Sequence, residues 1–113
     1  MSKASDMARL ADLAQLVLDH RLGKLRGAVA ELERSRMQIA ALDLPSAPQD
    51  LEPVRAEKVA LTYSRWADQR RAELNLVIAR QTVDWIEARA EAQTAFGRVQ
   101  ALSGLATRLK PDR

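Results

Sequence analysis

The chain has 113 residues, of which 47% are hydrophobic but only 4% are aromatic, so it has few large side chains with which to fill the core of a multilayer enzyme. Its 18 Lys and Arg residues are interspersed with 15 Asp and Glu residues, and the absence of Cys excludes disulfides and thiolate metal sites. The frequent Ala, Leu, Arg and Glu residues are typical of long helices, so we predict an all-α fold.

The first predicted helix covers about residues 5–43. Ser5 can cap its first turn, and Asp6 complements the positive end of the helix dipole. Apolar residues then recur at alternating steps of four and three, which is the spacing of a coiled-coil seam: Leu18, Leu22, Leu25, Val29, Leu32, Arg36 and Ile39. Leu10, Leu13 and Val17 form a similar stripe shifted by one residue, which predicts a register adjustment near Leu18.

Residues 44–53 hold three of the four prolines and separate the two helix-forming stretches. Proline in a helix interior loses a hydrogen bond and clashes with the preceding turn. We therefore predict a hinge here and a single domain over residues 1–113, folded as a long antiparallel two-helix coiled-coil hairpin.

The second predicted helix covers about residues 54–109. Asp50 or Glu52 can cap it, and Pro53 fits its first turn. Its early seam is predicted to use Val59, Tyr63, Trp66 and Arg70. After a register change near Leu74, the seam continues with Ile78, Gln81, Trp85, Ala88, Ala92, Ala95, Val99, Leu102, Ala106 and Leu109.

The two predicted helices differ in length, so they cannot match end to end. A hinge centred on the prolines places Leu32 opposite Trp66 and either Ala11 or Ala14 near Trp85. It leaves a C-terminal helical overhang beyond about Gln93. An apolar stripe without an internal partner predicts an external one. The predicted partner interface is this overhang together with the start of the first helix: Met7, Leu10, Phe96, Val99, Leu102, Leu105 and Leu109.

Polar residues at seam positions, Arg36, Arg70 and Gln81, can fix the register, extend to water or face a partner. Tyr63 and Trp66 stand beside several cations, an arrangement that can stack nucleobases, but the seam explains both rings without a ligand. Arg65 and Arg71 are then exposed cations that can contact an acidic protein partner.

Residues suited to catalysis are sparse. His20 is the only histidine, and no nucleophile and base converge with it on a straight helix. Asp84, Glu87 and Glu91 follow helical spacing, which is more typical of a solvated face than of a metal site. We expect no catalytic residue, cofactor, metal or small-molecule substrate. No signal peptide or membrane-spanning run is visible, so we expect a cytoplasmic protein that does not insert into a membrane.

Two segments carry a family resemblance: Leu18-Asp19-His20-Arg21-Leu22-Gly23-Lys24-Leu25-Arg26 and Tyr63-Ser64-Arg65-Trp66-Ala67-Asp68-Gln69-Arg70-Arg71. With the predicted architecture, they resemble the FliJ/YscO family of flagellar and type III secretion systems, which includes export chaperones. The resemblance implies a stalk similar to the gamma subunit of rotary ATPases. Its paired termini would enter a hexameric export ATPase, and its hairpin would face an export-gate component at the membrane.

The expected function is therefore that of a non-enzymatic adaptor or stalk in a protein-export ATPase complex. Two alternatives remain open. The first is a self-associating coiled coil, in which a homodimer forms a four-helix assembly through the same apolar stripe. The second is a basic helical nucleic-acid binder, which the dispersed cations disfavour.

Overall fold

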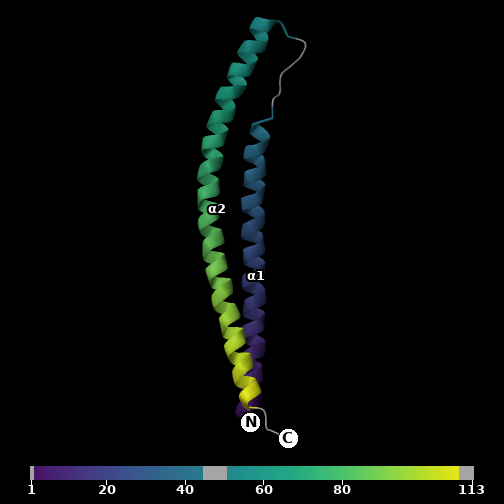
Figure 1. Cartoon of the computed structure of the whole chain (residues 1–113), viewed down its shortest axis with the longest axis vertical. Helices are drawn as coiled ribbons and strands as arrows, with labels where there is room; N and C mark the ends of the chain where they lie inside the picture. Colours follow the sequence, from purple (N-terminus) through teal and green to yellow (C-terminus); the bar gives the residue numbers. More distant parts are fainter. Residues whose placement is uncertain (1, 45–50, 110–113) are drawn as a thin grey trace. The chain divides into compact units, whose positions relative to one another are not determined.

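The computed structural model describes residues 2–44 and 51–109, which form two helices and no strand: α1 (Lys3–Leu42) and α2 (Pro53–Leu109) (Figure 1). The predicted all-α helical hairpin is confirmed. Contacts divide the chain into two compact units, to both of which each helix contributes. The terminal unit comprises Met1–Val29 and Asp84–Arg113, and the middle unit comprises Ala30–Val83.

The first helix begins two residues before its predicted start. The Ser2 hydroxyl oxygen accepts a hydrogen bond from the backbone N–H of Ser5 at 3.1 Å. Ser2 is therefore the N-terminal cap in place of the predicted Ser5, and it satisfies one of the free N–H groups of the first turn.

The second helix begins at Pro53, whose ring fits the first helical position because no hydrogen bond is required of its nitrogen there. The backbone carbonyl of Glu52 accepts the first helical hydrogen bond, from Ala56 at 2.8 Å. The other predicted cap, Asp50, lies outside the described residues, as does most of the predicted hinge.

The inner face of α1 follows alternating steps of three and four residues without interruption. Ala28 and Ser35 occupy this face where Val29 and Arg36 were predicted, and both predicted residues are exposed. The predicted adjustment near Leu18 is absent, because small residues continue the stripe toward the N-terminus. The inner positions are Ala4, Met7, Ala11, Ala14, Leu18, Arg21, Leu25, Ala28, Leu32, Ser35, Ile39 and Leu42.

The inner face of α2 agrees with the predicted seam from Ile78 to Ala106 and departs from it earlier. Ala67 is buried, whereas the neighbouring Trp66 is 54% exposed and Val59 is also exposed. Two successive steps of four lead from Arg70 through Leu74 to Ile78 and span the predicted register change. In the middle unit, Leu74 and Ala67 pack with Leu42, and Ile39 and Tyr63 complete this cluster.

The helices pair with an offset that differs from the predicted one. In the terminal unit, Nη1 of Arg21 donates to Oε2 of Glu91 at 2.7 Å, and Ala92 and Ala95 are buried. Val99, Leu102 and Ala106 are half-buried, so the C-terminal part of α2 packs against the N-terminal part of α1. The predicted C-terminal overhang is therefore wrong.

The unopposed stretch lies instead at the beginning of α2. In the middle unit, the Tyr63 hydroxyl donates to the carbonyl of Leu42, the last residue of α1. The turns of α2 before Tyr63 therefore lie beyond the described end of α1 (Figure 1). The prediction centred the pairing on the prolines, whereas the pairing follows the two Ala-rich inner stripes, which allow a close approach of the backbones.

Candidate protein-interaction surfaces

The N-terminal part of α1 packs mainly through small residues, with Met7 as the exception, and leaves several large residues exposed. Ala4, Ala11 and Ala14 are half-buried on its inner face. By contrast, Leu13 is 59% exposed and Leu16 is 64% exposed. In a helix that lies on a protein core, the larger apolar residues normally take the buried positions.

The C-terminal part of α2 shows the same arrangement. Its buried positions in the terminal unit are Ala88, Ala92 and Ala95, whereas Ile86 and Phe96 are about half exposed. We use the name outward apolar residues for the large exposed apolar side chains of this unit: Leu10, Leu13, Leu16, Val17, Val29, Ile86, Phe96, Leu105 and Leu109. They give the paired ends of the chain an apolar surface suited to a protein partner.

The predicted interface residues fall into two groups. Leu10, Phe96, Leu105 and Leu109 belong to the outward apolar residues, whereas Met7, Val99 and Leu102 are half-buried on the inner faces.

Sequence reasoning missed Leu13 and Leu16 as surface candidates. The signal was available, because Ala11 and Ala14 continue the spacing of Leu18 without any shift, and that register turns the neighbouring leucines outward.

A groove of about 340 Å³ runs between the helices of the terminal unit. Leu18, Leu22 and Leu25 line it from α1, and Ala92 and Phe96 line it from α2. The Arg89 guanidinium, which also borders the groove, lies 5.6 Å from the centre of the Trp85 ring. The groove floor is aliphatic, so it favours an apolar side chain over a polar ligand.

Charged residues of α1 and α2 also face one another in the terminal unit, where Arg21 forms an ion pair with Glu91 and Lys24 lies close by. Glu91 accepts the hydrogen bond from Arg21, and Asp84 and Glu87 lie near Lys24. The described residues contain no group of three or more His, Cys, Asp or Glu that is arranged to hold a metal ion. His20 is exposed on α1.

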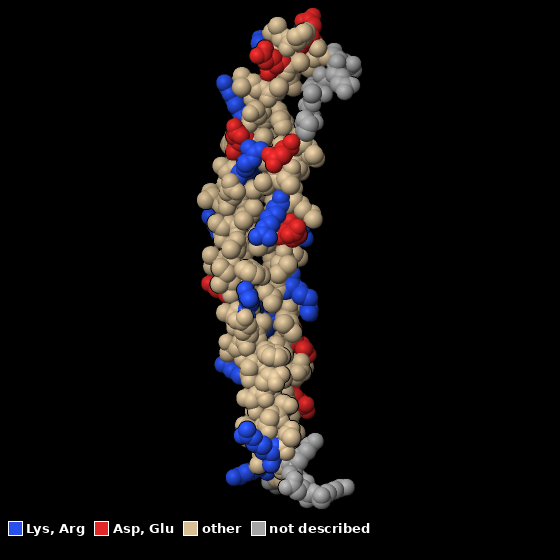
Figure 2. Space-filling model, viewed as in Figure 1, with Lys and Arg blue, Asp and Glu red and all other residues tan. Residues whose placement is uncertain are grey.

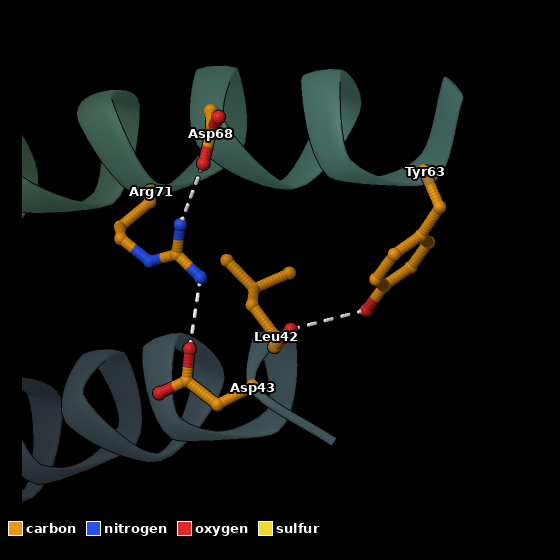
Figure 3. A network of polar contacts seen from close by, with 5 residues as sticks. All are labelled: Leu42, Asp43, Tyr63, Asp68 and Arg71. Carbon is orange, nitrogen blue, oxygen red and sulfur yellow. Dashed lines mark hydrogen bonds and ion pairs between the residues drawn. The ribbon is translucent and has the colours of Figure 1, made fainter. Parts of the chain in front are cut away.

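Arg71 joins the end of α1 to α2 in the middle unit (Figure 3). Its Nη2 donates to Asp43 at 2.9 Å and its Nη1 donates to Asp68 at 2.9 Å. The Tyr63 hydroxyl donates to the carbonyl of Leu42 at 3.3 Å and so satisfies a carbonyl that has no partner within α1.

This network assigns a structural role to Arg71. Asp43 follows the last turn of α1, where the helix dipole disfavours a negative charge and no basic side chain is present. Arg71 compensates that charge from α2. Its guanidinium is therefore engaged within the chain, whereas Arg65, the other predicted contact for an acidic partner, is exposed.

A second groove, of about 490 Å³, lies on the first turns of α2. Its described lining is Lys58, Val59, Thr62, Tyr63 and Trp66. The Tyr63 and Trp66 rings pack at a tilt with their centroids 5.7 Å apart. Val59, Tyr63 and Trp66 of the predicted early seam thus line one groove, but α1 contacts only Tyr63 and leaves Val59 and Trp66 exposed.

Charged side chains of both signs are dispersed over the face shown in Figure 2, with broad uncharged areas between them. Neither described helix holds an apolar stretch long enough to cross a membrane. No family model matches the sequence, and no curated protein or solved structure matches it at a significant level, so the FliJ/YscO resemblance stays a prediction.

Proposed function

We propose that the chain is a non-enzymatic coiled-coil adaptor, or stalk, of a flagellar or type III protein-export ATPase complex, and that its paired termini engage the ATPase. One observation carries the proposal: the terminal unit packs its helices through several Ala residues together with Leu18, Leu25, Val99 and Leu102, and it leaves further Leu, Val, Ile and Phe side chains exposed. Exposed apolar side chains in this number favour burial against another protein.

The charge distribution also favours the terminal unit as the part that binds the partner. The terminal unit has ten Lys or Arg and seven Asp or Glu residues, whereas the middle unit has eight of each. The net charge of +3 therefore belongs to the terminal unit. Positive charge beside apolar groups favours a partner surface that is apolar with acidic borders.

The identity of the partner rests on the resemblance of segments 18–26 and 63–71 to the FliJ/YscO family. From this resemblance we infer that the hexameric export ATPase is the partner of the termini and that an export-gate component is a partner of the hairpin. In this proposal the chain acts in the cytoplasm and at the membrane export apparatus. There it assists assembly of the ATPase complex and acts as a chaperone in protein export.

The test is to mix the purified chain with the export ATPase of the same cell and to measure co-elution and ATP hydrolysis. We expect a stoichiometric complex and increased turnover or hexamer formation. Leu13→Ser should weaken both effects because it removes an outward apolar residue. Leu76→Ser is the matched control, since Leu76 has a similar exposure of 65% but lies in the middle unit.

The absence of co-elution together with unchanged turnover would contradict the proposal. A weaker complex with Leu76→Ser than with Leu13→Ser would contradict the assignment of the binding end.

A second candidate function, self-association, is favoured by the terminal groove. Phe96 is 53% exposed at the border of a groove whose floor is Leu18, Leu22 and Leu25. The same side chain from a second copy can fill that groove, which would give a four-helix homodimer. We expect Phe96→Ala to dissociate such a dimer in sedimentation. A wild-type monomer at a concentration of about 50 µM would contradict this candidate, because a stable dimer has a lower dissociation constant.

A further inference from the structure

The first turns of α2 carry an apolar stripe that the described part of α1 contacts only at Tyr63. Ala56, Val59, Tyr63 and Trp66 follow steps of three and four, so they lie on one face of the helix. Trp66 is 54% exposed and Val59 is 42% exposed. Such a stripe is the half of a coiled-coil contact that a second helix completes.

A row of cations borders this stripe on one side. Arg55, Lys58 and Arg65 stand one position before Ala56, Val59 and Trp66, so they share a helix face adjacent to the stripe. All three are exposed, and none forms an ion pair with another described residue. The nearby Arg70 and Arg71 differ, because they pair with Glu73 and with Asp43 and Asp68.

The opposite border is nearly neutral and turns toward the end of α1. It consists of Glu57, Ala60, Ser64 and Ala67, and Ala67 packs against Leu42. The open side of the groove is therefore its basic side. Lys58 itself lines the groove, so its side chain borders the apolar floor.

We propose that the groove formed by Lys58, Val59, Thr62, Tyr63 and Trp66 binds an amphipathic helix of a partner protein, and that acidic residues along one border of that helix pair with Arg55, Lys58 and Arg65. The apolar face of the partner covers Val59 and the two rings. The groove shares no residue with the outward apolar residues of the terminal unit, so the proposal does not depend on the ATPase.

Charge argues against a second copy as the occupant. In an antiparallel pair of identical helices, the same border of each helix lies on the same side of the contact. Two copies would then bring Arg55, Lys58 and Arg65 next to their counterparts, and like charges at such positions are destabilising. An acidic border on a different helix removes that repulsion and gains ion pairs.

The test uses a helical peptide with Leu at its a and d positions and Glu along one border, and a second peptide in which Lys replaces every Glu. The full chain carries Trp85→Phe, which leaves Trp66 as the single tryptophan reporter. We expect the acidic peptide to shift Trp66 emission to shorter wavelength, with affinity that falls as salt is added. The basic peptide should bind about tenfold more weakly, since three exposed ion pairs become repulsions.

Two variants separate the apolar and the charged contributions. Val59→Ser should reduce affinity for the acidic peptide several-fold, whereas the control Val83→Ser, at an exposed valine of the same unit outside the groove, should not. Arg65→Glu should weaken the acidic peptide and strengthen the basic one. Circular dichroism of each variant checks that the helices persist.

Several results would overturn the proposal. Equal affinity for the two peptides would remove the charge argument, and binding without a change in Trp66 emission would place the peptide elsewhere. A dimer that Val59→Ser dissociates would make a second copy the occupant. Tighter binding of a single-stranded oligonucleotide than of the acidic peptide would assign the rings and cations to nucleobases and phosphates.

Discussion

Truncation of Leu74 tests the packing of the middle unit, because Leu76 offers a control of the same residue type on the same helix. Leu74 is 3% exposed and packs with Leu42 and Ala67, whereas Leu76 is 65% exposed. Leu→Ala removes three carbons, which at about 0.8 kcal/mol each amounts to about 2.4 kcal/mol of transfer free energy. The half-buried neighbours Ile39 and Tyr63 can close over the gap, so the added cavity cost is small.

We therefore expect Leu74→Ala to lower the free energy of unfolding by about 2 to 3 kcal/mol. Leu76→Ala should change it by less than about 0.5 kcal/mol, because the side chain buries little surface. Both substitutions alter helix propensity equally, so their difference reports packing alone. Urea unfolding followed by far-UV circular dichroism measures both values. Equal losses for the two variants would refute the assigned inner face of α2.

Three further substitutions give predictions with distinct causes. Arg71→Ala should lower the free energy of unfolding by about 1 kcal/mol at low salt and by less at high salt, since it breaks two exposed ion pairs; a loss that does not depend on salt would contradict this account. Gln81→Leu should raise it by about 1 kcal/mol, because the buried Oε1 of Gln81 has no hydrogen-bond partner among the described residues; a decrease in urea midpoint would count against this. Gly27→Ala should raise it by up to about 1 kcal/mol, because an added Cβ meets no atom within 4 Å; unchanged thermal unfolding would show that the expected helix-propensity gain is not realised at this position.

The two helices could be predicted from the sequence because their limits depend on local chemistry. Pro53 marks the start of α2, and strong helix formers continue from there to Leu109. The later seam of α2 could also be predicted, since from Ile78 onward a single stripe combines apolar character with regular spacing.

The inner face of α1 could not be predicted in the same way, because two stripes compete there. Leu10, Leu13 and Val17 are larger, but Ala11 and Ala14 are in phase with Leu18. The choice depends on the facing helix, where Ala92 and Ala95 favour a close approach of the backbones. A rule that assigns the larger residues to the seam therefore fails at this end of the molecule.

The candidate surfaces depended on that choice and on the offset between the helices. Trp66 was assigned to the seam, but the offset places Ala67 against Leu42 and leaves the indole exposed. The role of Arg71 requires Asp43, which lies 28 residues away in the sequence. The spacing of residues within one helix does not predict an ion pair between residues so far apart in the sequence.

The most direct test of the account is the pairing of the two chain ends, since the outward apolar residues exist only in that register. Ala14 and Val99 are both inner residues, and each lies about two helical turns from the Arg21 to Glu91 ion pair in the direction of its own chain end. The chain has no native Cys, so Ala14→Cys combined with Val99→Cys gives one defined thiol pair. A short bifunctional thiol reagent should crosslink this pair within one chain and leave Ala14→Cys with Trp85→Cys unlinked. Efficient crosslinking of the Ala14 and Trp85 pair with none of the Ala14 and Val99 pair would contradict the account. The two results are distinguishable because Trp85 and Val99 lie about 21 Å apart along α2.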